Sequence, residues 1–311
     1  MRLVTFLRLG EPRLGAVVGG QVIDLNAGYQ YLQERTGIPR ARERSAVVLP
    51  PDMIGFLTNG EEALSAARNV VEQVSKAEST TLAGKGILYG LKAVALKAPV
   101  PRPTKLILVG LNYRDHAEEA GMKIPTEPTL FSKYPSVVIG PGEGIRMPKV
   151  STQIDYEGEF AFVIGKSGKD IPRERALDHV AGYTIVHDVS CRDYQMRTGQ
   201  WMVGKTFDTF APMGPYLVLK DEVPDPHNLD LTTRLNGEVM QHSNTKHLIF
   251  NVFDLIAYMS QVFTLEPGDV VSTGTPAGVG FARNPQVFLK PGDVIRIEIT
   301  GLGALENPIV A

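Results

Sequence analysis

The hydrophobic positions of the first hundred residues change period once. Residues 1–30 alternate apolar and polar side chains, and Gly19-Gly20 lies between two apolar runs, a pattern that predicts a β-hairpin. Residues 52–76 change to the spacing of short amphipathic helices. Catalytic side chains do not cluster in this part of the sequence. We therefore expect residues 1–97 to form a small α+β domain.

A second region begins after three prolines at residues 98–103, which favour a stiff, extended linker and exclude a helix. The apolar run at 105–110 predicts a buried strand. Prolines and glycines interrupt residues 121–148, for which we expect a long loop. The 31 glycines and 22 prolines of the chain favour many strands joined by turns. The prediction is a mixed α/β, β-rich fold with its catalytic domain at residues 104–311.

The segment 154–160 carries carboxylates at alternate positions. In a β-strand, Asp155, Glu157 and Glu159 would share one face. Like charges in a largely apolar strand have raised pKa values unless a cation neutralises them. Oxygen ligands of this kind suit Mg²⁺, Mn²⁺ or Ca²⁺. A solvated strand face is the alternative that this segment alone leaves open.

Two more polar clusters follow apolar strands. Asp188 ends a predicted strand at 182–190 and would be the third carboxylate ligand, leaving open positions for water and a chelating substrate. His116 and Glu119 follow the strand at 105–110 and share one face if they lie on a helical turn. A carboxylate beside an imidazole orients it as a general base. An incidental pair at the start of a surface helix is an equal alternative.

Further polar side chains lie downstream of the acidic residues. Arg192 and Gln195 are suited to bind a carboxylate or a carbonyl group. Lys205, in an apolar and glycine-bounded context, would stabilise an enolate near the metal. The alternative for Lys205 is a surface ion pair with Asp208.

A glycine-rich loop at residues 272–280 follows a predicted strand. Its free N–H groups, that of Gly274 among them, and the hydroxyl group of Thr275 could hold a substrate carboxylate. The loop lacks the Gly-Lys-Ser/Thr ending of a Walker loop. Lys133, in the segment that we expect to be a loop, either adds a cation or is solvated.

The composition excludes several classes of partner and compartment. A net charge of −2 gives no electrostatic case for nucleic acid or membrane surfaces. No apolar run approaches the length of a membrane span, and the first residues lack a signal-peptide pattern. The single cysteine, Cys191, excludes an intrachain disulfide and fits a reducing cytoplasm. We expect a cytoplasmic protein that binds neither nucleic acid nor membrane.

Five motifs taken together resemble the fumarylacetoacetate hydrolase superfamily. The resemblance covers residues 104–311, and the whole chain is similar to the two-domain branch that includes oxaloacetate tautomerases. Two mild departures are His187, where many members have Asn, and Cys191, where Ala is usual. The motifs are Asn-Tyr-x-x-His-x-x-Glu at 112–119, Asp-Tyr-Glu-x-Glu at 155–159, His-Asp-Val-Ser-x-Arg-Asp-x-Gln at 187–195, Gly-Lys-x-Phe-Asp at 204–208 and Thr-Gly-Thr-Pro-x-Gly-Val-Gly at 273–280.

The resemblance implies a β-roll catalytic domain, a homodimer and a small 2-oxo acid as substrate. It also implies Mg²⁺ or Mn²⁺ as the cofactor, with Ca²⁺ possible in a crystal. The site residues that it implies are Glu157, Glu159 and Asp188 for the metal, His116 with Glu119 for water activation, Lys205 for the oxyanion or enolate, and Gln195 and Thr275 for the substrate.

Three hypotheses about function follow. The first is a hydrolase that cleaves a C–C bond in a 2,4-dioxo acid such as an acylpyruvate, by way of an enolate that the cation and Lys205 stabilise. The second is a tautomerase or decarboxylase acting on oxaloacetate or a related oxo-diacid. The third is a non-catalytic protein of the same fold that binds a metal or ligand. The metal ligands are the same in the first two, so the ligand set does not separate them.

Overall fold

The N-terminal part of the computed structural model is a β-meander covered by helices; the structure describes residues 1–77, 79–119, 121 and 123–311. Strands β1 (Arg2–Arg8), β2 (Glu11–Val18) and β3 (Gln21–Asp24) pair antiparallel in sequence order. Gly19 and Gly20 turn the predicted hairpin with φ values of 55° and 79°, which glycine adopts without strain. The helices are α1 (Leu25–Arg35), α2 (Ala41–Val48), α3 (Met53–Thr58), α4 (Gly60–Ser75) and α5 (Ser79–Gly84).

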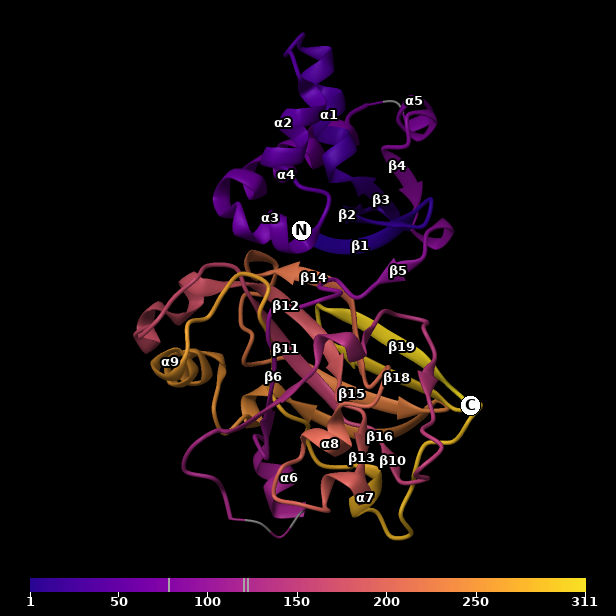
Figure 1. Cartoon of the computed structure of the whole chain (residues 1–311), viewed down its shortest axis with the longest axis vertical. Helices are drawn as coiled ribbons and strands as arrows, with labels where there is room; N and C mark the ends of the chain where they lie inside the picture. The colour runs from indigo at the N-terminus through magenta and orange to yellow at the C-terminus, as the bar shows by residue number, and fades with distance from the viewer. Residues whose placement is uncertain (78, 120, 122) are drawn as a thin grey trace.

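One long mixed sheet joins this lobe to the rest of the chain. Its strand order is β4-β3-β2-β1-β14-β12-β11-β17-β6-β7, with β5 on β1 and β8 on β14. β1 meets β14 through the pairs Arg2↔Val218 and Leu3↔Leu217. Figure 1 shows the helical lobe above the larger body that contains the C-terminus. The remaining strands of this sheet are β4 (Leu88–Gly90), β5 (Leu96–Lys97), β6 (Leu106–Gly110), β7 (Thr129–Lys133), β8 (Val138–Ile139), β11 (Gly158–Ile164), β12 (Val180–His187), β14 (Ala211–Leu219) and β17 (Val270–Ser272).

A second sheet of five strands packs against the first, in the order β16-β15-β18-β19-β9. A two-stranded ladder of β10 (Ile154–Asp155) and β13 (Ser190–Cys191) lies beside the end of β11. The strands of the second sheet are β9 (Ile145–Arg146), β15 (Asp230–Leu235), β16 (Glu238–Asn244), β18 (Val294–Ile299) and β19 (Gly303–Val310). The helices of this body are α6 (Arg114–Glu119), α7 (Arg192–Gln195), α8 (Met202–Lys205) and α9 (Val252–Val262), and 3₁₀ turns lie at Leu91–Ala93, Pro135–Val137, Arg173–His179, Lys220–Glu222, Thr245–His247 and Gly280–Ala282.

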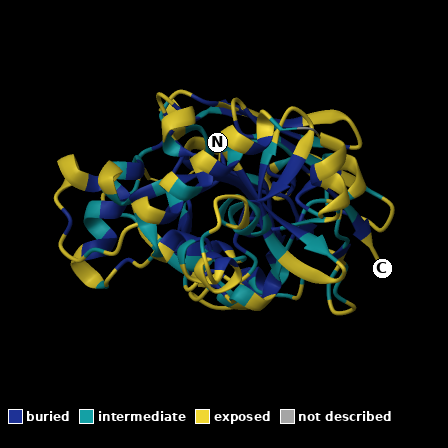
Figure 2. Ribbon diagram, turned by 90° about the horizontal axis from the view of Figure 1, so that it is seen from above, coloured by how far each residue is buried: buried dark blue, intermediate teal, exposed yellow. Residues whose placement is uncertain are grey.

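Strand β11 is buried on both faces, which explains its continuous apolar sequence. Ala161 and Val163 face the core that the long sheet shares with the N-terminal helices. Phe160 and Phe162 face the core between the two sheets and α9. In Figure 2 the buried strands lie in the middle of the molecule and the exposed residues lie on the outer turns and helices. The site is therefore built at the end of a strand that is buried along its whole length.

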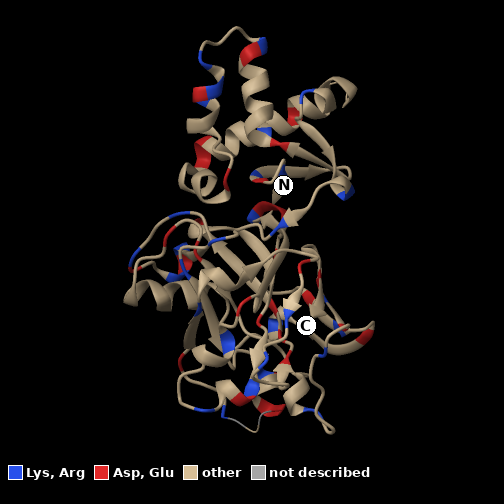
Figure 3. Ribbon diagram, turned by 45° about the vertical axis from the view of Figure 1, so that its right-hand side comes forward, with Lys and Arg blue, Asp and Glu red and all other residues tan. Residues whose placement is uncertain are grey.

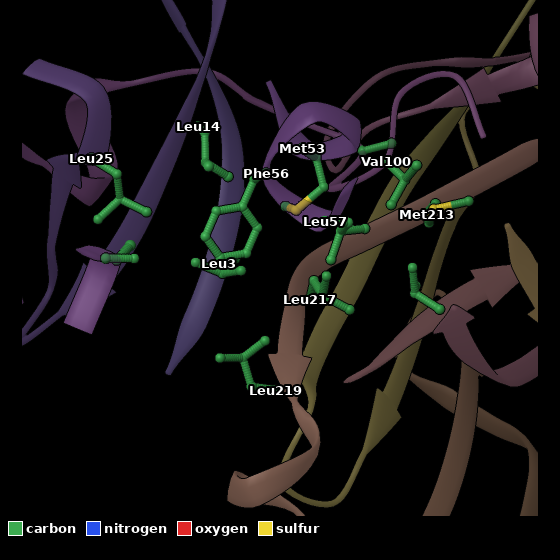
Figure 4. Close-up of a cluster of buried hydrophobic side chains, with 14 of the residues drawn as sticks. Leu3, Leu14, Leu25, Met53, Phe56, Leu57, Val100, Met213, Leu217 and Leu219 are labelled. Atoms are coloured by element: carbon green, nitrogen blue, oxygen red, sulfur yellow. The ribbon is translucent and has the colours of Figure 1, made fainter. Parts of the chain in front are cut away.

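The first core crosses the seam between the two lobes. Figure 4 shows Leu3 and Phe56 from the N-terminal lobe near Leu217 of β14. The proline-rich segment 98–103 belongs to this seam, since Ala98 and Val100 are buried in the same core. The sheet continues from one lobe into the other, and the division of the chain at residues 98–103 stays a prediction.

Several predicted elements are confirmed, one prediction needs correction, and two helices were not predicted. The hairpin, the helices within residues 52–76, the strand at 105–110 and the mixed α/β class are all present. The segment 121–148 is not one long loop, because β7 pairs with β6 over its whole length; position 122 lies outside the described residues. Sequence periodicity also missed α1 and α2. The signal for α1 was Asp24, whose side chain caps the helix by accepting a hydrogen bond from Ala27 N at 2.9 Å.

No helix among the described residues combines the length and the apolar character that a membrane span requires.

The seam predicts a sharp contrast between two leucines of the first hairpin. Leu3 is fully buried, whereas Leu9 is 97% exposed. We expect Leu3→Ala to lower the free energy of unfolding by about 2–5 kcal/mol, because a cavity opens where β1 meets β14. Leu9→Ala, the matched control, should change it by less than about 0.5 kcal/mol. Urea unfolding measures both, and equal losses would contradict the packing described.

Candidate metal centre and active site

Three carboxylates converge at one end of β11. Glu157 lies between β10 and β11, Glu159 is on β11, and Asp188 directly follows β12. One oxygen of each lies within 4.8 Å of the others. The Asp188 N–H donates to Glu157 O at 2.9 Å, so the backbone itself fixes the two segments together. All three residues are buried, which confirms that this is not a solvated strand face.

Asp155 does not share this position, contrary to the prediction of one face for three acidic residues. The strand is interrupted at Tyr156 and Glu157, so β10 and β11 pair with different partners. The Asp155 carboxylate instead binds Arg192, with Oδ2 at 2.8 Å from Nε and 2.7 Å from Nη2. The interruption of the strand redirects one carboxylate away from the other three.

Three buried cations surround the triad. Lys205 Nζ lies 2.8 Å from Glu157 Oε2, 2.7 Å from Asp188 Oδ2 and 2.7 Å from Ser190 Oγ. Arg192 Nη2 lies 2.7 Å from Glu157 Oε1. Lys133 Nζ lies 2.6 Å from Asp188 Oδ1 and also donates to the carbonyl oxygens of Val189 and Phe210. Lys133 is thus buried behind Asp188 and not solvated, and Lys205 does not form the surface pair with Asp208.

The cations act unequally on the three carboxylates. Burial disfavours the charged form of Glu157, but Lys205 and Arg192 outweigh burial and lower its pKa to about 2. For Lys205, burial opposes the charge, but Asp188 and Glu157 outweigh it and raise the pKa. Burial, then the charges of Asp188 and Glu157, raise the pKa of Glu159 well above its usual range. Glu159 is therefore the carboxylate that lacks compensation.

The contacts of Glu159 agree with this. Its Oε2 accepts hydrogen bonds from Ser272 Oγ at 2.5 Å and from Gly274 N at 3.1 Å. Within the described residues, no Lys or Arg forms an ion pair with it. Four buried carboxylates, those of the triad and Asp155, face only the three cations Lys133, Arg192 and Lys205. The cluster is one positive charge short.

The residues present fit a divalent cation. The three oxygens are close enough to share one ion, and all-oxygen ligation is the preference of Mg²⁺, Mn²⁺ and Ca²⁺. Within the described residues, no hydrogen bond reaches the buried Asp188 Oδ1, although Lys133 lies beside it. A divalent ion would change the deficit of one positive charge into an excess of one, which an anionic ligand could balance.

The predicted His–Glu pair lies on α6 and lines the same cavity. His116 Nδ1 lies 3.2 Å from Glu119 Oε2, and Gly278 N donates to Glu119 Oε1 at 2.9 Å. Burial acts to raise the pKa of Glu119, but these two hydrogen bonds outweigh it and lower the pKa. Asp115 holds the helix in place, because its Oδ2 accepts a hydrogen bond from Ser243 of β16. Hydrogen bonds to the rest of the protein therefore hold the pair in a fixed position in the cavity wall.

The N–H groups of the glycine-rich loop are not free, contrary to expectation. Gly274 N donates to Glu159 and Gly278 N donates to Glu119, so the loop holds protein carboxylates. A Cβ atom on Gly278, whose φ is +103°, would lie 2.2 Å from Met240 O. The Thr275 hydroxyl donates to Gly158 O at 3.0 Å and accepts from Gln241 Nε2 at 2.8 Å. The loop thus fixes the positions of site residues through its hydrogen bonds and has no free N–H group at Gly274 or Gly278 for a substrate.

A cavity of about 530 Å³ joins these groups, and of the ten predicted site residues only Gly274 is absent from its lining. Arg192 Nη1 donates to Gln195 Oε1 at 2.9 Å, so these two side chains act as one surface. Figure 3 shows acidic and basic residues meeting inside the larger body as well as on the outer helices. The sequence did not predict that one wall of the cavity is apolar. This apolar wall consists of Val109, Leu111, Phe131, Met196, Trp201, Val279, Phe281 and Ala282.

A model of the family described as "Fumarylacetoacetate (FAA) hydrolase C-terminal" matches residues 105–310. The chain belongs to the fumarylacetoacetate hydrolase family. It is 46% identical over 315 residues to the mitochondrial oxaloacetate tautomerase Fahd2a of Rattus norvegicus, an alignment that covers 100% of this chain and 92% of the relative. The family assignment made from the five motifs is therefore confirmed.

Solved structures of the family share the whole fold. Fumarylacetoacetate hydrolase from Exiguobacterium antarcticum matches with a TM-score of 0.79 and 33% identity, covering 100% of this chain and 99% of that one. Maleylpyruvate hydrolase from Sphingobium sp. SYK-6, in complex with manganese(II) ion and pyruvate, matches with a TM-score of 0.73 and 30% identity over the same shares. These neighbours are enzymes that act on small oxo acids or are named for doing so.

The expectation of a cytoplasmic protein is wrong. It rested on one cysteine and on the absence of a signal-peptide pattern, neither of which distinguishes between reducing compartments. Several relatives that match the full length of this chain carry mitochondrial names. A reducing interior is common to both compartments, which is why the cysteine argument could not separate them.

The unbalanced charge of Glu159 predicts opposite effects of Glu159→Gln. The affinity for Mn²⁺ should fall by more than about 100-fold, because an anionic carboxylate ligand becomes a neutral amide. The free energy of unfolding of the metal-free protein should stay level or rise, because the buried charge is gone. Calorimetric Mn²⁺ titration and urea unfolding measure the two quantities. Glu174→Gln, an exposed control, should leave both unchanged, and full Mn²⁺ affinity in Glu159→Gln would place the metal elsewhere.

Proposed function

We propose that this protein is a divalent-metal-dependent oxaloacetate keto–enol tautomerase. The observation that carries the proposal is the meeting of the His116–Glu119 pair, Lys205 and the carboxylate triad in one cavity. The identity of 46% with an oxaloacetate tautomerase over the whole chain supports it. Tautomerisation needs only movement of a proton between carbon and oxygen, and the cavity contains a base and a cation for that purpose.

We infer that Mg²⁺ or Mn²⁺ is the ion, held by Glu157, Glu159 and Asp188. The hard oxygen donors support this choice, as does the manganese(II) in the maleylpyruvate hydrolase neighbour. When bound, a divalent ion supplies Lewis-acid polarisation of the 2-oxo group. The excess positive charge that it creates in the buried cluster favours a dianionic substrate such as oxaloacetate.

The residues of the chain then carry the proton and the charge. His116 exchanges a proton with carbon 3 of the substrate through Nε2, because Nδ1 is held by Glu119. Glu119 keeps the imidazole oriented and is itself fixed by Gly278 N. The Lys205 ammonium stabilises negative charge as it develops on the 2-oxo oxygen. This division leaves each side chain one task.

The substrate carboxylate groups need polar partners in the same cavity. Arg192 and Gln195 line it as a connected pair, and Arg192 is charged at all relevant pH values. Thr275 borders the same space, although its hydroxyl group already has two protein partners. We assign carboxylate binding to Arg192 and Gln195, and a packing contact to Thr275; Gly274 does not line the cavity and instead holds Glu159 through its N–H group.

The second candidate is C–C bond hydrolysis of an acylpyruvate-type 2,4-dioxo acid, which the motifs had placed first. The His116–Glu119 pair is what such a reaction needs to activate water. The maleylpyruvate hydrolase neighbour also supports it. The full-length relatives reverse the order, because several of them are named oxaloacetate tautomerases. Membership in this enzyme family gives no support to a non-catalytic protein. A homodimer stays a prediction.

Parallel assays separate these activities. Purified protein with Mn²⁺ should accelerate loss of oxaloacetate enol absorbance without releasing pyruvate. Pyruvate from oxaloacetate would indicate a decarboxylase instead. Pyruvate and acetate from acetylpyruvate at a comparable kcat/KM would make the protein a hydrolase. No activity on either substrate would contradict both assignments.

The role of His116 is tested in the same assay. His116→Ala should lower kcat/KM for tautomerisation by about 10²–10⁴-fold, because the proton-transferring group is lost. Mn²⁺ affinity should stay close to that of the unaltered protein, because no ligand changes. His242→Ala, on the exposed face of β16, is the matched control and should retain activity. Retained activity in His116→Ala would assign the base to another residue.

A further inference from the structure

Asp155 is fully buried, yet it neither lines the cavity nor joins the metal triad. We propose that Asp155 is a positioning residue that connects Arg192 to the loop at residues 278–282. It thereby shapes the part of the cavity wall that Arg192 and Phe281 form. This inference rests on the proposed function, because it concerns the same site. It assigns a task to the one carboxylate of the buried cluster that the metal chemistry does not use.

One side of Asp155 holds the loop. Oδ1 accepts a hydrogen bond from Gly280 N at 2.7 Å, and Oδ2 accepts one from Phe281 N at 2.9 Å. A Cβ atom on Gly280 would lie 1.8 Å from Val287 O and 2.7 Å from Asp155 Oδ1, so only glycine allows this approach. Phe281 lines the cavity. The carboxylate therefore sets where this part of the wall lies.

The other side of Asp155 holds the guanidinium group of Arg192. Nε lies 2.8 Å and Nη2 2.7 Å from Oδ2. Nη2 also reaches Glu157 Oε1 at 2.7 Å, and Nη1 donates to Gln195. The guanidinium carbon lies 5.8 Å from the centre of the Phe281 ring, so the loop and the arginine also contact each other through the ring face. Arg192 is thus held from outside the cavity by Asp155 and, along the cavity wall, by Glu157, Gln195 and Phe281.

The acceptor count explains why a carboxylate is needed. Four hydrogen-bond donors converge on its two oxygens: the N–H groups of Tyr156, Gly280 and Phe281, and Nε of Arg192, while Nη2 of Arg192 lies 2.7 Å from Oδ2 as an ion pair. An ionised carboxylate accepts at about four lone-pair sites and donates none, whereas an amide offers one acceptor oxygen and an NH₂ group. In Asp155→Asn, the NH₂ group would face donors, and the buried Arg192 would lose one of its two charge partners.

The test separates substrate binding from metal binding. Oxalate, a planar dianion that resembles an enolised 2-oxo acid, is titrated into protein saturated with Mn²⁺. We expect the Kd for oxalate to rise by about 10–100-fold in Asp155→Asn, because Arg192 and the loop lose their common support. The Kd for Mn²⁺ should change by less than about tenfold, because all three ligands remain. Asp193→Asn, which alters a neighbouring Asp bonded to Ser151 outside the cavity, is the matched control and should leave both unchanged.

A double-mutant cycle tests whether Asp155 acts through Arg192. If it does, Asp155→Asn combined with Arg192→Lys should bind oxalate about as weakly as the weaker single variant. Losses that multiply would show independent roles and overturn the proposal. An unchanged Kd for oxalate in Asp155→Asn would also overturn it, as would loss of Mn²⁺ binding alone, which would make Asp155 a support of the metal ligands only.

A conservative variant guards against loss of the fold. Asp155→Glu keeps the charge, but its extra methylene must displace either the loop or Arg192, so weaker oxalate binding is again expected. Tight oxalate binding in Asp155→Glu would contradict the geometric argument. These titrations do not depend on turnover. If the tautomerase assay fails but oxalate binding changes as expected, the proposed activity is rejected and the positioning role of Asp155 stands. If the tautomerase assay succeeds but oxalate binding in Asp155→Asn is unchanged, the proposed activity stands and the positioning role is rejected.

Discussion

The structure depends on an imbalance of buried charge. Four carboxylates near the start of β11 share three cations, and Glu159 is the one that forms no ion pair with Lys or Arg in the part of the chain that the structure describes. In a low-dielectric interior such a deficit is costly, so a cluster of this kind persists when another cation completes it. The same imbalance favours an anionic substrate. With a divalent ion bound, the buried cluster would carry an excess of one positive charge, which such a substrate could balance.

The fold makes this imbalance possible. β11 is buried on both faces, so residues at its start are held between two cores and cannot turn toward water. The glycine-rich loop then supplies N–H donors to three protein carboxylates, those of Glu119, Glu159 and Asp155. Backbone donors of this kind position acidic groups without adding side chains to the cavity. The loop thus joins the base, the metal ligands and the substrate wall in one hydrogen-bonded frame.

Much of the site could be predicted from the sequence, because several of its residues that act together are also close in sequence. The two-residue spacing of Glu157 and Glu159 and the three-residue spacing of His116 and Glu119 are local, and both pairs meet as expected. The position of Asp155 could not be predicted. The strand is interrupted at Tyr156 and Glu157, so Asp155 does not share a face with Glu157 and Glu159, and the periodicity of the sequence does not reveal this interruption. The partners of the loop N–H groups and of Lys133 come from residues distant in sequence, which local patterns do not encode. α2 was missed because an arginine with φ of 56° and no side-chain cap precedes it.

The central claim is that Glu157, Glu159 and Asp188 hold one divalent ion. Anomalous diffraction from crystals grown with MnCl₂ tests it most directly, because the manganese signal locates the ion independently of turnover. The account predicts one strong peak with an oxygen of each of these residues at about 2.0–2.3 Å. A peak elsewhere, or none at this site with Lys205 still bridging Glu157 and Asp188, would contradict it.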